Sequence, residues 1–139
     1  MTQEEKQLLL KDLSARLIYK PFAYKTYREG TKLMEGDSPL ETDDIDMLSE
    51  TDDILKETGY TIKPYLRPMS SMTEEEKEEI RQQFCYEWEE SVTELMYCSI
   101  EIGDADYFID WLNEHHFDYR GLIEKGLALE APEGMYKTE

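Results

Sequence analysis

Long apolar runs, cysteine and histidine are scarce in this chain, and each shortage argues against a class of protein. No apolar run approaches the roughly 18 to 20 residues that a membrane-spanning helix needs, and the opening MTQEEKQLLLKDL lacks the basic start and apolar middle of a signal peptide. We therefore expect a cytoplasmic protein. The two cysteines, Cys85 and Cys98, lie on one predicted helix about 20 Å apart along its axis, which is too far for a disulfide. We expect two reduced thiols packed as small hydrophobic groups, with an intermolecular or metal-binding role as the alternative.

Motifs of catalysis and cofactor binding are missing as well. The sequence contains no Gly-x-Ser-x-Gly elbow, no glycine-rich phosphate loop and no Cys-x-x-Cys pair. The only histidines, His115 and His116, lack the preceding carboxylate that a helical metal site would place three residues earlier. The acidic residues of segment 35–59 do not follow the order of an EF-hand calcium loop. We predict that the protein is not an enzyme and holds no metal or other cofactor.

Basic residues are few and unevenly placed. Against 33 Asp and Glu the chain has 15 Lys and Arg, for a net charge of −18, yet the first 32 residues carry +3. Between Arg81 and Arg120 no Lys or Arg occurs at all. Direct binding to a phosphate backbone through this acidic half is therefore disfavoured. Solubility alone would also account for an acidic surface.

What the chain does contain is a long stretch with helical periodicity, at residues 73–99. Thr73 and Glu76 have the spacing of a capping box, which marks the start of a helix. Apolar or small residues then recur on one side, at Ile80, Phe84, Trp88, Ser91, Val92, Leu95 and Ser99. The opposite side carries Gln83, Glu87, Glu90 and Glu94. The sequence therefore predicts one long amphipathic helix.

The N-terminal part of the chain predicts a helix followed by a hairpin. Thr2 and Glu5 have the spacing of a second capping box, ahead of a helical pattern over residues 3–17. Aromatic and β-branched residues in segment 17–34, with turn residues at 28–30, predict two antiparallel strands. The hairpin mixes basic with aromatic side chains, which single-stranded nucleic acid can use, although a half-exposed hairpin explains the same composition.

The middle of the chain predicts an acidic insertion and an edge strand. Residues 35–59 hold ten acids and one lysine, and we expect a solvated connection with one or two helical turns, whose order the sequence leaves open. Pro64 and Pro68 predict an edge strand and a non-helical approach to the long helix. Gly103 is expected to end that helix, and Asp104 to cap the next one.

These elements predict a single α+β domain over residues 1–139, with an N-terminal helix, a small antiparallel sheet and C-terminal helices. Asp118 is expected to cap a last short helix ending at Gly126, ahead of a loose tail at 131–139. The predicted core packs the helices against the sheet. It comprises Leu9, Leu13, Phe84, Trp88, Leu95, Phe108, Trp111 and Leu112.

Three strings carry a resemblance to other sequences: MTQEEKQLLLKDL at the start, IKPYLRPMSSMTEEEK at 62–77 and HHFDYRGLIEKGLALEAPEGMYK at 115–137. They resemble a family of short uncharacterised proteins from gut-bacterial genomes and their mobile elements. Residues 18–61 resemble that family only loosely. The resemblance implies a bacterial or phage-derived cytoplasmic protein, and it supplies no activity, cofactor or site residue.

Two functional hypotheses follow from the acidic half, and both predict a protein partner with a basic surface. The first is a non-enzymatic adaptor or inhibitor, in which exposed aromatic residues act as anchors inside a charged rim. The second is a nucleic-acid mimic from a phage or mobile element, whose carboxylates imitate phosphates and block a basic groove of a host protein. Binding to a membrane or directly to nucleic acid is not predicted. The predicted contact residues are Tyr86, Glu87, Glu90, Glu94, Tyr97, Asp106, Asp110 and Glu114.

Overall fold

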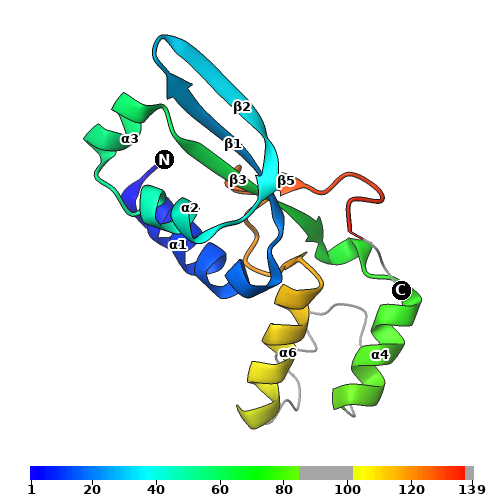
Figure 1. The fold of residues 1–139 in the computed structure, drawn as a ribbon. Coiled ribbons are helices and arrows are strands. Elements are labelled where there is room, and N and C mark those ends of the chain that lie inside the picture. Colours follow the sequence, from blue (N-terminus) through cyan, green and yellow to red (C-terminus); the bar gives the residue numbers. More distant parts are fainter. Residues whose placement is uncertain (85–101, 137–139) are drawn as a thin grey trace.

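The computed structural model describes residues 1–84 and 102–136, and at residues 81, 84 and 102–106 it describes the backbone alone. Within these ranges, strands and helices form the α+β fold that the sequence predicts (Figure 1). The helices are α1 (Gln3–Arg16), α2 (Thr42–Leu48), α3 (Asp52–Thr58), α4 (Glu74–Phe84) and α6 (Ile102–Glu114), and 3₁₀ turns cover Leu17–Tyr19 and Met69–Ser71. The strands are β1 (Phe22–Glu29), β2 (Lys32–Pro39), β3 (Thr61–Pro68), β4 (Phe117–Asp118) and β5 (Leu129–Glu130).

The sheet is mixed rather than purely antiparallel. β1 and β2 form the predicted hairpin, and the other edge of β1 pairs antiparallel with the first half of β3. The two short strands β4 and β5 pair parallel with the second half of β3. The prediction of an edge strand around Pro64 and Pro68 is therefore wrong, because β3 lies between β1 and β4. Each proline falls on the last residue of a ladder, where its missing N–H leaves the pairing of the strand intact.

Two of the predicted helix starts are confirmed in atomic detail. The Thr2 hydroxyl accepts from the Glu5 N–H at 3.1 Å, and the Glu5 carboxylate accepts from the Thr2 N–H at 2.8 Å. The same reciprocal pair joins Thr73 to Glu76, at 3.1 and 3.0 Å. Each box satisfies two backbone donors that the first turn of a helix leaves free.

The acidic segment 35–59 is more regular than the predicted loop with one or two turns. Its first residues extend β2 to Pro39, and the rest forms α2 and α3. The repeated string ETDDI, at 41–45 and 50–54, opens both helices, so its aspartates lie in first turns, where the helix dipole favours negative charge. Leu40 and Leu48 from this segment are part of the apolar core.

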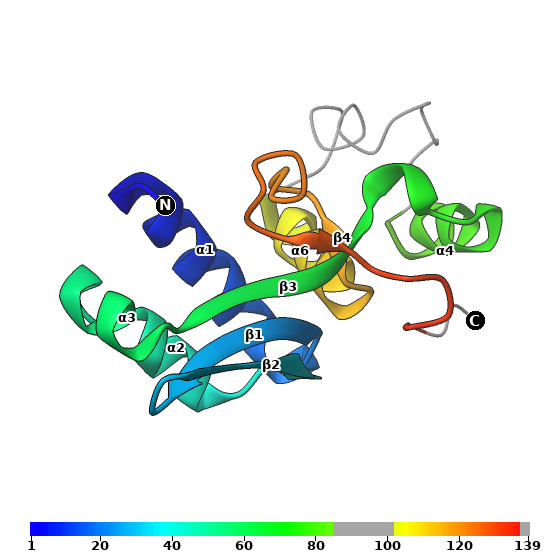
Figure 2. The same cartoon turned by 90° about the horizontal axis from the view of Figure 1, so that it is seen from above.

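The apolar core consists of two clusters that belong to two groups of helices. α1, α2 and α3 lie at the hairpin end of the sheet, whereas α4 and α6 lie beyond the far end of β3 (Figure 2). The first cluster contains Leu9, Leu13, Ala23, Leu40, Leu48, Ile62, Leu66, Leu122, Leu127 and Ala128. The second contains Met72, Ile80, Phe108, Trp111, Leu112 and Phe117.

The core prediction is confirmed for five residues, which do not share one cluster. Leu9 and Leu13 are buried in the first cluster, and Phe108, Trp111 and Leu112 are buried in the second. The remaining predicted core positions are the side chain of Phe84, Trp88 and Leu95, which lie outside the described residues.

Two predicted boundaries in the C-terminal half are wrong. Gly103 and Asp104 lie within α6 (Ile102–Glu114), so Gly103 does not end a helix and Asp104 does not cap the next one. Asp118 does accept from the backbone N–H groups of Leu122 and Ile123, at 2.9 and 3.0 Å, but residues 122–126 form turns and not a helix. The cap that the sequence predicts is present, and it stabilises a compact loop.

The predicted loose tail is docked on the sheet as far as residue 136. The Ala131 N–H donates to the Leu66 carbonyl at 2.8 Å. The Tyr136 hydroxyl donates to the Tyr65 carbonyl at 2.8 Å and accepts from the Phe22 N–H at 2.9 Å. The Tyr136 hydroxyl thus links the backbone of β1 to that of β3.

Buried ion pairs connect the helices to the strands. The Arg16 side chain is 0% exposed, donates from Nε to Asp12 at 2.8 Å and donates from Nη2 to the Phe117 carbonyl at 2.6 Å. Arg120 binds the other oxygen of Asp12 at 2.7 Å. On the other side of Phe117, Arg67 of β3 donates two hydrogen bonds to Glu76 of α4, at 2.6 and 2.8 Å. Charged groups therefore fix how α1 and α4 sit on the sheet.

Asp12→Ala should lower the free energy of unfolding by about 3 to 5 kcal/mol, because it leaves the buried charge of Arg16 without its carboxylate. The matched control is Lys20→Ala, which removes an exposed 3.6 Å ion pair with Glu41 and should cost less than about 1 kcal/mol. Urea denaturation of both variants measures the difference. Equal losses in the two variants would show that the Asp12 and Arg16 charges are solvated.

Candidate functional site

The structure describes only part of the predicted contact surface. Tyr86, Glu87, Glu90, Glu94 and Tyr97 all lie outside the described residues. Of the predicted residues on α6, Asp106 has a described backbone only, whereas the side chains of Asp110 and Glu114 are described and both are exposed. The described part of the predicted surface therefore centres on α6.

Two faces of α6 differ sharply in character. Phe108, Trp111 and Leu112 are buried in the second cluster and hold the helix against Phe117. Tyr107, Asp110 and Glu114 follow one another at spacings of three and four residues, which places them on one line along the outer surface. Tyr107 is 69% exposed, although it is a large aromatic residue. An aromatic ring therefore stands in solvent beside a row of carboxylates.

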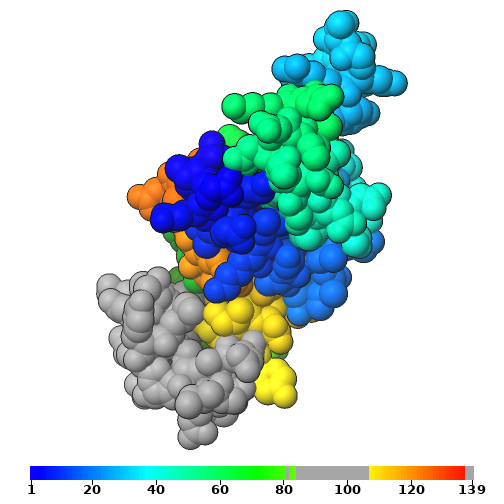
Figure 3. All heavy atoms as spheres, turned by 90° about the vertical axis from the view of Figure 1, so that its left-hand side faces the viewer, coloured from blue at the N-terminus to red at the C-terminus, as the bar shows by residue number. Residues whose placement is uncertain are grey.

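A second segment borders this line of side chains. Figure 3 shows α6, in yellow, against the end of α1 and the turn that follows it, in blue. Partial burial raises the pKa of the Tyr19 hydroxyl in that turn, and the nearby carboxylates of Asp110 and Glu114 raise it further. Ile18, the preceding residue, is 79% exposed. We call Tyr19, Tyr107, Asp110 and Glu114 the α6 face.

The α6 face combines exposed apolar groups with negative charge. Large apolar side chains in solvent are typical of docking surfaces when they lie close together. Sequence reasoning found Asp110 and Glu114 but missed Tyr107 and Tyr19. The exposure of Tyr107 could have been predicted from the helical periodicity that buries Phe108 and Trp111. The approach of Tyr19 to α6 could not, because it depends on tertiary packing.

The two adjacent histidines occupy different environments. The His115 ring stacks on Trp111, with centroids 3.9 Å apart, and its Nδ1 lies 2.8 Å from the Trp111 carbonyl, at the end of α6. His116 has a positive φ of 64° and stacks on Tyr136 at 3.9 Å. Burial lowers the pKa of His116 to about 4, and the positive charge of Arg16 contributes. His116 is therefore a neutral packing group at pH 7.

Two buried polar atoms near this histidine have no hydrogen-bond partner among the described residues. They are His116 Nδ1 and Arg16 Nη1. No group of three or more His, Cys, Asp and Glu side chains in the described ranges is arranged to hold a metal ion.

Comparison with protein-family models, with curated proteins and with solved structures gives no match for this chain. None of the helices in residues 1–84 and 102–136 is long and apolar enough to cross a lipid bilayer. Function has to be inferred from the side chains themselves.

Acidification should destabilise the protein through His116. Its pKa in the fold is about 4, below the ordinary value near 6.5, so the unfolded chain takes up the proton first and stability falls as the pH drops from 6.5 toward 4. His116→Asn removes the titration, and asparagine tolerates a positive φ. The stability of this variant relative to wild type should rise by about 2 kcal/mol between pH 7 and pH 4.5. Urea denaturation at the two pH values measures it, and a pH-independent difference would contradict a buried neutral His116.

Proposed function

We propose that the protein is a non-enzymatic adaptor or inhibitor that docks on a basic surface of another protein through the α6 face. The observation that carries the proposal is the exposure of Tyr107, a 69% exposed aromatic side chain on a helix whose other face is fully used by the core. Aromatic residues of this kind are the usual anchors of protein interfaces.

The carboxylates of the α6 face supply a different part of the interaction. Asp110 and Glu114 are exposed and form no ion pair with another described residue. Charges at the rim of an interface change the rate of association and its salt dependence more than they change the final affinity. We therefore assign affinity to Tyr107 and selection of a basic partner to the carboxylates.

Truncation of Tyr107 tests this assignment. Wild-type protein immobilised as bait captures its partner from a bacterial lysate, and the affinity is then measured with the purified partner. Tyr107→Ala should weaken binding by at least about tenfold, as expected for loss of a hot-spot aromatic, without loss of thermal stability. Asp110→Lys with Glu114→Lys should slow association and should not change dissociation to the same extent.

The control reverses the same number of charges elsewhere. Glu57 and Glu124 are exposed and lie outside the α6 face, so Glu57→Lys with Glu124→Lys should leave capture unchanged. A third variant, Glu87→Lys with Glu90→Lys and Glu94→Lys, tests the part of the predicted acidic surface that lies outside the described residues. Full capture by every variant would refute an acidic docking surface and would direct attention to the hairpin of β1 and β2.

Salt separates this proposal from nucleic-acid mimicry. A mimic binds through many charge contacts, which added salt screens. Its affinity should therefore fall by orders of magnitude between about 50 and 300 mM salt. An interface anchored by Tyr107 should lose less than about tenfold over the same range, since burial of an aromatic ring is insensitive to screening. A steep salt dependence together with a silent Tyr107→Ala variant would favour the mimic.

A further inference from the structure

A cleft with basic walls lies on the side of the molecule formed by α1, α3 and the sheet. Its volume is about 980 Å³, which is near the upper end for pockets that take small organic molecules. Five of the residues that line it are Lys or Arg, and two are Asp or Glu. The chain as a whole has 15 basic and 33 acidic residues. Basic residues therefore outnumber acidic residues in the cleft, whereas acidic residues outnumber basic residues in the whole chain.

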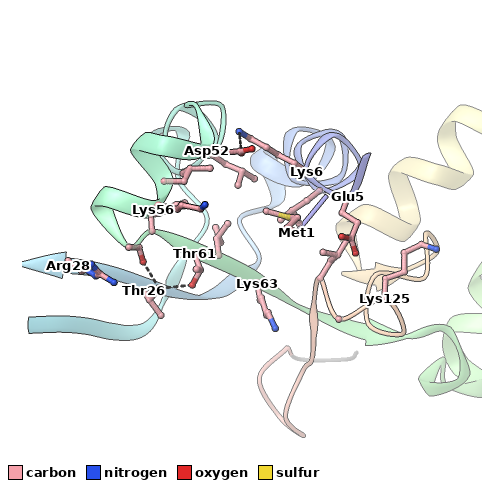
Figure 4. Close-up of a pocket in the computed structure, with 18 of the residues that line it drawn as sticks. Met1, Glu5, Lys6, Thr26, Arg28, Asp52, Lys56, Thr61, Lys63 and Lys125 are labelled. Carbon is pink, nitrogen blue, oxygen red and sulfur yellow. Dashed lines mark hydrogen bonds and ion pairs between the residues drawn. The ribbon is translucent and has the colours of Figure 1, made fainter. Parts of the chain in front are cut away.

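The basic residues reach the cleft from separate elements (Figure 4). They are Lys6 of α1, Arg28 of β1, Lys56 of α3, Lys63 of β3 and Lys125 of the turn before β5. In Figure 4, Lys56 projects from α3 toward α1, Lys125 lies beyond Glu5 at the far end, and Lys63 leaves β3 on the side away from α3. These cations are thus spread along the cleft rather than forming one cluster.

Both carboxylates of the cleft are already engaged within the protein. Glu5 accepts the Thr2 N–H of the capping box at 2.8 Å. Asp52 accepts from Gln3 at 2.6 Å and pairs with Lys6 at 3.6 Å. In contrast, Arg28, Lys56 and Lys63 form no ion pair with another described residue. The positive charge of the cleft is therefore only partly neutralised.

Two of the cations have a structural explanation as well. Gly59 ends α3 at a φ of +68°, and a Cβ there would lie 2.7 Å from the Arg28 Cγ, so the Arg28 stem packs on the end of that helix. Lys56 lies in the last turn of α3. Positive charge at a helix C-terminus is favourable, but this accounts for neither Lys63 nor Lys125.

The floor of the cleft is aliphatic. Leu9, Leu48, Ile62 and Leu127 line it from the first apolar cluster, with Leu55 beside them. Tyr60 is the one aromatic residue among the described residues that line the cleft, and its hydroxyl donates to Asp44 at 3.0 Å. A nucleobase would need an aromatic platform for stacking, whereas an alkyl chain is matched by Leu and Ile side chains.

We propose that this cleft binds an amphiphilic organic anion, in which an aliphatic chain carries a carboxylate or phosphate head group. The chain lies on the leucine and isoleucine floor, and the head group pairs with cations at the rim, among them Lys56 and Lys125. This binding site is independent of the α6 face, which lies beyond the other end of α1 (Figure 2).

Titration with a fluorescent fatty acid, 11-(dansylamino)undecanoate, tests the proposal on the full chain. Palmitate and dodecyl phosphate, both below their micelle concentrations, should displace it. Dodecanol, which has the chain without the charge, and ATP, which has the charge without the chain, should not. No binding of the fluorescent ligand, or displacement by ATP as efficient as by palmitate, would overturn the proposal.

A pair of charge-reversal variants locates the site. Lys56→Glu with Lys125→Glu should weaken binding at least about tenfold, because repulsion replaces attraction at the rim. Lys11→Glu with Lys20→Glu changes the net charge equally at exposed lysines that do not line the cleft, and it should bind as wild type does. Circular dichroism checks that all variants are folded. Equal weakening in both pairs would mean that net charge, and not this cleft, governs binding.

The head group could belong to a free amphiphile or to a lipid in a membrane. Sedimentation with vesicles of phosphatidylglycerol and phosphatidylcholine distinguishes the two sources. We expect the protein to stay in the supernatant, since a net charge of −18 is repelled by an anionic surface. If the wild-type protein sediments with the vesicles and the variant Lys56→Glu with Lys125→Glu does not, the cleft contacts a membrane lipid. That result would overturn the proposal of a free ligand.

Discussion

The arrangement of α1 depends on the need to pair a fully buried arginine. Arg16 has no contact with solvent, and its hydrogen-bond partners are Asp12, one turn earlier, and the Phe117 carbonyl, 101 residues along the chain. A buried guanidinium is tolerated only where such partners are fixed. Since Arg120 completes the pairing of Asp12, α1 can pack only when residues 117–120 are in place. One flank of α1 then lines the basic cleft, and the turn after it borders the α6 face.

Local features of the fold were predictable from the sequence because they depend on neighbouring residues. The capping boxes at Thr2 and Thr73, the hairpin and the buried side of α6 each follow from spacings of a few positions. Features that depend on residues far apart in the sequence could not be predicted in this way. The prolines of β3 predicted an edge strand. β3 is instead an inner strand, because β4 and β5 pair parallel with it. The tail is held by Tyr136, whose partners lie 71 and 114 residues away.

The same distinction applies to the candidate sites. The acidic character of α6 was visible as an interval without bases, but Tyr19 comes close to its carboxylates only through the fold. The cleft is a stronger case, because its cations come from separate elements and lie far apart in the sequence, so no local pattern marks them as one site. The net charge is −18, but the cleft has a local excess of positive charge. We propose that this excess allows a specific anion to bind to a protein whose surface otherwise repels anions.

The buried pairing of Arg16 is the feature that the rest of this account requires, and nuclear magnetic resonance observes it directly. Hydrogen exchange of the Arg16 Nε–H group, compared with that of the exposed Arg28, reports whether the guanidinium is shielded by Asp12 and Phe117. We predict that the Arg16 Nε–H exchanges at least about 100-fold more slowly, because exchange needs opening of the packed helix. Exchange as fast as that of Arg28 would contradict the account, since α1 would then not be fixed by a buried charge.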